Sequence, residues 1–309
     1  MIPKKMQLAW LPIYGFLFRL RPVHFLRSIA FALFALCTCN NLFASTIINL
    51  ERQQTITQDQ LISVLRKADF ILLGELHDNP YHHQIRGQII KQLSNKKYSI
   101  VVEYLLADQK VKFSGSTLQS LEEFGYSPKA WPWKIYQPLF EDIRASGLTI
   151  YGSNLERNIS KALFTGGALP PNMQDAYDKS SLDTSAKRQL DQDLIDGHCG
   201  KLPAHYLEPM FKVQRLTDIS MAQVMIAHQP AILLAGNGHI RRDYGVPQVL
   251  TSLTPSRSKI SVGFVEEEKR DAKTLTDLHQ QYDFIWITPS IKREDPCANL
   301  HFGKSQSSK

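Results

Sequence analysis

Eight residues, Phe70-Ile-Leu-Leu-Gly-Glu-Leu-His77, join a short apolar run to a polar turn. A run that is apolar at every position is typical of a strand covered by helices on both faces of its sheet. Five more runs share this character: Ser99-Ile-Val-Val102, Leu148-Thr-Ile-Tyr151, Ala231-Ile-Leu-Leu-Ala235, Ile260-Ser-Val-Gly-Phe-Val265 and Tyr282-Asp-Phe-Ile-Trp-Ile287. We expect a strand at each of these runs.

Helical segments separate the predicted strands. Residues 80–93 follow Asn79, a residue that caps helix N-termini, and begin with Pro80, which suits the first helical position. Residues 211–227 have apolar side chains near helical spacing, and we expect Met210, Met221 and Met225 to pack in the core. The alternation predicts an α/β fold: an open, mainly parallel sheet flanked by helices.

Residues 155–205 interrupt this alternation with Gly166-Gly167, Pro170-Pro171 and a polar segment at Met173–Leu194. We expect a small inserted helical subdomain there. The predicted organisation is a signal peptide at residues 1–44, an α/β domain at 45–300 and a flexible tail at 301–309.

The first 44 residues have the composition of a secretory leader. They contain five basic residues and no acidic residue, then an apolar run at Ile29–Cys37 and a small residue, Ala44, before the expected cleavage. The apolar run is shorter than the roughly 20 residues that cross a bilayer. We therefore expect an exported, periplasmic protein. Attachment to the cell envelope through a lipid on Cys37 or Cys39 is the minor alternative.

Composition and charge exclude several classes of protein. A chain of 309 residues with 43% hydrophobic residues is neither a disordered protein nor a disulfide-dense miniprotein. Without the leader, the 36 Lys and Arg fall to 31, against 29 Asp and Glu. A nucleic-acid-binding domain keeps a basic patch in its folded part, so we expect no nucleic-acid partner.

Two cysteines follow the leader, Cys199 and Cys297. In an exported protein a cysteine pair usually forms a disulfide, which is the interpretation that we favour. A metal thiolate and a haem thiolate are the alternatives.

Two similar tetrapeptides follow two of the predicted strands, Gly74-Glu-Leu-His77 and Gly236-Asn-Gly-His239. The strand at 99–102 is followed directly by Glu103. Parallel strands end at one edge of their sheet, and ligands bind at that edge in open α/β folds. We therefore expect Glu75, His77, Glu103 and His239 to lie together at this edge, around the mouth of one ligand-binding cleft. Such a set suits an acid–base pair or a divalent metal held by His77, His239 and Glu75. The alternative is that the glycines only form turns and the histidines only donate hydrogen bonds.

The segments beside this mouth carry further candidates. On a helix that begins at Pro80, His82 and Arg86 lie one turn apart, and we expect them to border the mouth together with His83. The aromatic run Trp131–Phe140 is interpreted as a loop packed on the core, with a wall for a flat apolar ligand as the alternative.

The motif Leu73-Gly-Glu-Leu-His-Asp-Asn-Pro-Tyr-His-His83 resembles the opening motif of the ChaN-like haem-uptake proteins of the Tiki and erythromycin-esterase-like superfamily. The chain is similar to that family also at the aromatic run, at Gly197–Gly200 with Pro203, at Gln214 with Asp218, Met221 and Ala222, at Ala235–Asp243 with Gly245–Pro247, and at Arg293–Cys297.

The resemblance implies a cell-surface or periplasmic protein of haem and iron acquisition, with haem at a dimer interface near tyrosine and histidine. The candidates for contact with haem are Tyr81, His82, His83, Arg86, Tyr104, Tyr136 and His198. Haem-uptake receptors, transporter components and a second copy of the chain are the implied partners.

The resemblance leaves two functional hypotheses, with a scaffold that lacks catalytic activity as a third interpretation. The first is a haem-binding accessory of haem uptake. The second is a hydrolase of the esterase or peptidase type that uses Glu75, His77, Glu103 and His239, with or without a divalent metal.

Overall fold

The computed structural model describes residues 45–267 and 272–298; the predicted signal peptide and tail lie outside this part. The described strands are β1 (Thr46–Asn49), β2 (Gln54–Ile56), β3 (Phe70–Leu73), β4 (Ser99–Leu106), β5 (Ile150–Asn154), β6 (Ala231–Leu234), β7 (Lys259–Glu266) and β8 (Phe284–Thr288). The described helices are α2 (Gln58–Leu65), α3 (Pro80–Leu93), α4 (Thr117–Glu123), α5 (Trp133–Ala145), α6 (Arg157–Phe164), α7 (Pro171–Lys179), α8 (Thr184–Gly197), α9 (Ala204–Ala227), α10 (Val246–Leu253) and α11 (Ala272–Gln281).

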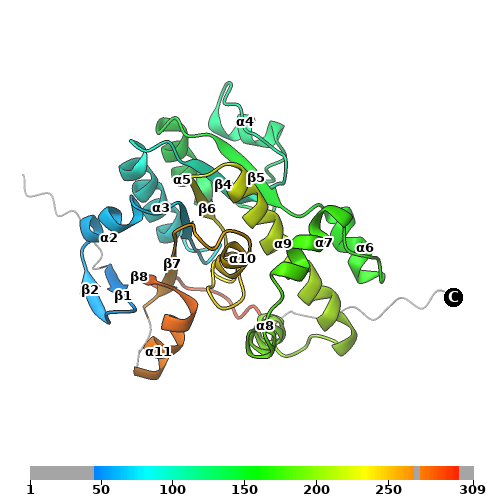
Figure 1. Cartoon of the computed structure of the whole chain (residues 1–309). Coiled ribbons are helices and arrows are strands. Elements are labelled where there is room, and N and C mark those ends of the chain that lie inside the picture. Colours follow the sequence, from blue (N-terminus) through cyan, green and yellow to red (C-terminus); the bar gives the residue numbers. More distant parts are fainter. Residues whose placement is uncertain (1–44, 268–271, 299–309) are drawn as a thin grey trace, which may run out of the picture. The chain divides into compact units, whose positions relative to one another are not determined.

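All eight described strands form one sheet in the order β2-β1-β8-β7-β3-β6-β4-β5 (Figure 1). The six strands from β8 to β5 are parallel to one another, and β1 pairs in the antiparallel direction with both β8 and β2. This confirms the predicted open, mainly parallel α/β fold. The hairpin of β1 and β2 was not predicted, because its strands are only four and three residues long.

Apolar cores lie on both faces of the sheet. Along β3, Ile71 and Leu73 belong to the core beneath α2, α3, α4 and α5, whereas Phe70 and Leu72 belong to the core beneath α6, α7, α9, α10 and α11. All four side chains are fully buried. Successive side chains of β3 thus face opposite cores, which explains why a central parallel strand is apolar at every position.

Two expectations about local structure differ from the structure. The aromatic run is not a loop: α5 begins at Trp133, and Tyr136 and Phe140 are buried on its inner face. The strand at 99–102 continues to Leu106, with a register irregularity against β5 between Val102 and Leu106, so Glu103 lies within the strand. In both cases contacts with distant segments of the chain extend a helix or strand beyond the residues whose local apolar pattern predicts it.

The other predicted helices occur as expected. α3 spans the predicted residues, and the Asn79 side chain accepts a hydrogen bond from the backbone of Tyr81. α9 begins seven residues before Phe211, at Ala204. The region of the predicted insertion contains α6, α7 and α8. Within the described residues, no helix is both long and apolar enough to cross a bilayer.

Gly152 of β5 allows a close approach of neighbouring backbone. A Cβ atom there would lie 2.0 Å from the carbonyl oxygen of Leu106. We predict that Gly152→Ala lowers the free energy of unfolding in urea by about 1–3 kcal/mol, because the backbone must shift. Gly197→Ala is the control, since nothing lies within 4 Å of its added Cβ. Equal stability of the two variants would contradict this explanation.

Candidate functional site

The loop between β3 and α3 carries a carboxylate that is almost completely buried. Glu75 is 1% exposed. Its Oε2 accepts a hydrogen bond from the Tyr104 hydroxyl at 2.8 Å, and its Oε1 accepts one from the Tyr136 hydroxyl at 2.9 Å. The guanidinium of Arg86, fully buried on α3, forms an ion pair with Oε2. Charge-assisted hydrogen bonds of this kind compensate for the removal of a carboxylate from water.

Glu75 also fixes the ring of His77. The Nδ1 atom of His77 lies 2.5 Å from Oε1 of Glu75, so the carboxylate favours the tautomer with hydrogen on Nδ1. Nε2 is then left as the ring's electron-pair donor. The side chain is 47% exposed, and its ring meets the edge of Trp131 at a centroid distance of 5.1 Å. His77 therefore presents an oriented imidazole to solvent.

A second histidine with a carboxylate partner lies in the loop after β6. Nδ1 of His239 is 2.7 Å from Oδ1 of the buried Asp218 on α9, and 3.0 Å from the Gln214 side-chain nitrogen. Nε2 lies 3.7 Å from Oε1 of Glu103. Burial alone would lower the pKa of His239, but Glu103 and Asp218 outweigh it and raise that pKa.

Gly236 shows that the two loops meet. Its backbone N–H donates to Oε2 of Glu103 at 2.7 Å. A Cβ atom at this residue would lie 3.0 Å from Nε2 of His77 and 3.7 Å from Oε2 of Glu103. The structure thus places Glu75, His77, Glu103 and His239 at one edge of the sheet, as the spacing predicts. Glycine at 236 keeps the space between them open.

The glycine of the first motif has a similar role. A Cβ on Gly74 would lie 2.1 Å from Oδ1 of Asn237. The Asn237 side chain accepts a hydrogen bond from the Phe264 N–H at 3.1 Å and donates to the Phe264 carbonyl at 2.6 Å. The two motifs therefore pack against each other, and Asn237 fixes both to β7.

His82 and His83 are fully buried, and contacts within the protein occupy both nitrogens of each ring. Nδ1 of His82 accepts from the Leu76 N–H at 2.9 Å, and Nε2 lies 2.8 Å from the Thr288 hydroxyl. Nε2 of His83 donates to the His77 carbonyl at 2.9 Å, and Nδ1 lies 2.9 Å from Arg86 Nη2. These residues support the loop from behind and offer no free nitrogen toward its surface.

The remaining candidates for haem contact lie in different settings. Burial raises the pKa of both Tyr104 and Tyr136, and both hydroxyls donate to Glu75. Tyr81 lies half-buried at the start of α3. His198 lies at the end of α8, where Nδ1 is 2.7 Å from the Leu194 carbonyl oxygen.

The described residues contain no group of three or more His, Cys, Asp or Glu side chains arranged to hold a metal ion. The divalent metal expected at His77, His239 and Glu75 therefore has no support. Nδ1 of His77 is committed to Glu75 and Nδ1 of His239 to Asp218, so these groups form two separate pairs.

Residue spacing alone did not identify Asp218 or Gln214, which lie on a helix more than twenty residues before His239. They entered the sequence analysis only through the family resemblance. Arg293 also approaches the site from a distant segment, through Asp78 beside His77.

The family model described as "Haem-binding uptake, Tiki superfamily, ChaN" matches residues 61–250, which is more than half of the chain. Among curated proteins, none matches the sequence.

Three solved structures match the chain. One is titled "Cofacial heme binding to ChaN of Campylobacter jejuni"; it is 23% identical, with a TM-score of 0.65, over 79% of this chain and 96% of the other. The type III effector HopBA1 is 11% identical, with a TM-score of 0.42, over 75% and 93%. A Bacillus cereus protein is 16% identical, with a TM-score of 0.39, over 68% of each chain. Only the first is similar enough to support the fold.

The buried histidines predict a loss of stability in mild acid. Burial lowers the pKa of His82 to about 3 and that of His83 to about 4, from 6.5. Between pH 6.5 and these values the unfolded chain binds protons that the folded chain does not. We expect the free energy of unfolding to be highest above pH 6.5 and to fall as the pH decreases to 4, on the order of 3 kcal/mol for His83 alone.

Urea unfolding between pH 4 and 8 measures this effect. His82→Gln should reduce the slope of stability against pH, whereas His279→Gln, at an exposed position on α11, should leave it unchanged. The same slope in the His82 variant and the wild-type protein would contradict the assignment.

Proposed function

Because the chain belongs to the ChaN family of haem-binding uptake proteins in the Tiki superfamily, we propose that it is an exported haem-binding protein in which His77 ligates the iron. The family match carries the proposal of haem binding. The choice of His77 rests on its half-exposed imidazole, whose Nδ1 is held by a buried carboxylate.

The chemistry of His77 suits a haem iron. Histidines that bind metals commonly donate their second ring N–H to a carboxylate, which fixes the ring and raises its basicity. Imidazole nitrogen is also a usual axial ligand of haem. Glu75 provides this support, and the edge of Trp131 adds an apolar surface beside the ring. Haem would supply an iron atom that accepts a nitrogen ligand.

The hydrolase hypothesis is less well supported than haem binding. The pairs Glu75–His77 and Asp218–His239 are arranged as carboxylate-supported bases, but the family match points to haem. The proposal also includes delivery of haem to a receptor or transporter and haem binding as a homodimer, which the resemblance in sequence implies.

Haem titration of the mature protein tests the function. We expect a sharp Soret band at one haem per chain, and we expect His77→Ala to weaken binding about 10-fold or more and to shift the band. His279→Ala is the control, because His279 is an exposed histidine on α11.

The same titration tests the position of the ligand. Tyr206 is tested as an alternative to His77, because its phenol lies in an exposed aromatic pair with Phe164. The two ring centroids are 5.9 Å apart. If Tyr206→Phe shifts the Soret band and His77→Ala does not, haem binding stands but His77 is not the ligand. A wild-type spectrum of free or aggregated haemin would refute the proposed function.

Export forms a separate part of the proposal. Two observations support it: the leader-like composition of residues 1–44, and the disulfide between Cys199 and Cys297, a bond typical of oxidising compartments. When the full chain is expressed in a bacterium with two membranes, we expect periplasmic protein that begins after Ala44. Mass spectrometry of the fractions measures this. Uncleaved cytoplasmic protein with free thiols would contradict export.

A further inference from the structure

The segment after β8, residues 289–297, is attached to the loop that carries His77. We call this segment the C-terminal strap. Asn79 of the loop donates from its side-chain nitrogen to the Pro289 carbonyl at 3.1 Å and to Oε1 of Glu266 at 2.6 Å. Asn79 is fully buried, so these contacts lie inside the protein.

Arg293 of the strap binds two carboxylates at once. Its Nε and Nη2 donate to the two carboxylate oxygens of Asp78 at 2.6 and 2.8 Å. Its Nη1 and Nη2 donate to the carboxylate of Glu266, at the end of β7, at 2.6 and 2.7 Å. A planar guanidinium that binds carboxylates by paired donors restricts their orientation as well as their distance.

Asp78 directly follows His77, so this contact acts on the backbone that carries the imidazole. Glu75 orients the ring through Nδ1, and His83 holds the His77 carbonyl. Beyond His77, two contacts join the loop to β7. Asn79 donates to Glu266, and Arg293 bridges Glu266 to Asp78, the residue directly after His77.

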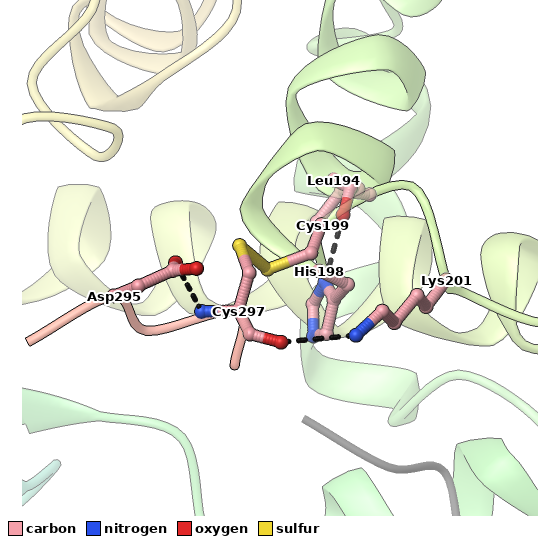
Figure 2. Close-up of a disulfide and its surroundings, with 6 residues drawn as sticks. All are labelled: Leu194, His198, Cys199, Lys201, Asp295 and Cys297. Carbon is pink, nitrogen blue, oxygen red and sulfur yellow. Dashed lines mark hydrogen bonds between the residues drawn. A yellow bond between two sulfur atoms is a disulfide. The ribbon is translucent and has the colours of Figure 1, made fainter. Parts of the chain in front are cut away.

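The far end of the strap is tied to the helical region (Figure 2). Cys297 is bonded to Cys199, which lies just after the end of α8. Lys201 donates to the Cys297 carbonyl at 2.9 Å. Because Arg293 lies only four residues before Cys297, the disulfide limits how far the guanidinium can move from Asp78.

We infer that Arg293 is a positioning residue for His77: it holds the loop through Asp78, and the Cys199–Cys297 disulfide keeps it in place. The inference deepens the proposed function, since it rests on His77 as the residue that faces haem. The strap thereby links the covalent state of the cysteine pair to the geometry of the binding site.

The test uses Arg293→Gln, with Arg293→Lys as the conservative variant and Arg257→Gln as the control. Arg257 is an exposed arginine that pairs with Asp69 at 3.6 Å, at the opposite edge of the sheet. One readout needs no haem: the NMR chemical shifts of the two ring nitrogens of His77, which report its tautomer and its contact with Glu75. The second readout is the haem affinity and Soret position.

We expect Arg293→Gln to change the His77 nitrogen shifts and to weaken haem binding about 10-fold, the usual scale for loss of a supporting contact. Arg293→Lys should recover part of the affinity, because it keeps the charge but not the paired donors. Asp78→Asn should reproduce the Gln variant, and the double variant should be no worse than either single one. Cys199→Ser with Cys297→Ser should change the same nitrogen shifts in the same direction.

The outcomes separate the inference from the proposed function. If the wild-type protein fails to bind haem but Arg293→Gln changes the His77 shifts, the positioning role stands and haem binding falls. If haem binds and neither readout changes in Arg293→Gln, the inference is refuted. Additive effects of Arg293→Gln and Asp78→Asn would also refute it, because residues that act through one contact cannot contribute independently. If Arg293→Gln does not fold, Asp78→Asn replaces it in both readouts.

Discussion

The buried carboxylate of Glu75 is the constraint on which the rest of the site depends. A charge removed from water must be matched by donors, and Glu75 receives them from Tyr104 on β4, Tyr136 on α5, Arg86 on α3 and His77 on its own loop. The protein therefore cannot lose any of these elements without leaving a buried charge short of partners. One side chain in this way joins the loop, two helices and β4, a strand separated from β3 by β6.

This arrangement divides the local histidines by role. His82 and His83 are buried and neutral, and use both ring nitrogens to support the loop. His77 is the one of the three whose ring reaches solvent, at 47% exposure. The sequence Tyr81-His82-His83 looks like a cluster of ligands, but both histidines are buried and support the loop from inside the protein. Of these three histidines, only His77 therefore presents its ring to a ligand from solvent.

The sequence predicted the six parallel strands β3 to β8, α3 and the meeting of the two Gly-x-x-His loops, because buried parallel strands leave a local apolar pattern and their ends coincide. It did not predict the roles of His83 or Arg86. Whether a side chain points inward depends on what packs over it, and that information lies in α5, some fifty residues away. The aromatic run was misinterpreted as a loop for the same reason. Asp218 and Arg293 reach the site from distant segments of the chain. Only the resemblance to a family singled out the motifs that contain them.

The order of the strands has a consequence for any shortened version of this protein. β3, which leads into Glu75 and His77, pairs with β6 on one side and β7 on the other. The family match ends at residue 250, before β7 begins at Lys259. A fragment trimmed to the matched region would leave one side of β3 without its neighbour, exposing unpaired backbone groups in the middle of an apolar sheet. Such an open edge promotes self-association, and β7, which lies outside the residues matched by the family model, protects this side of β3 from it.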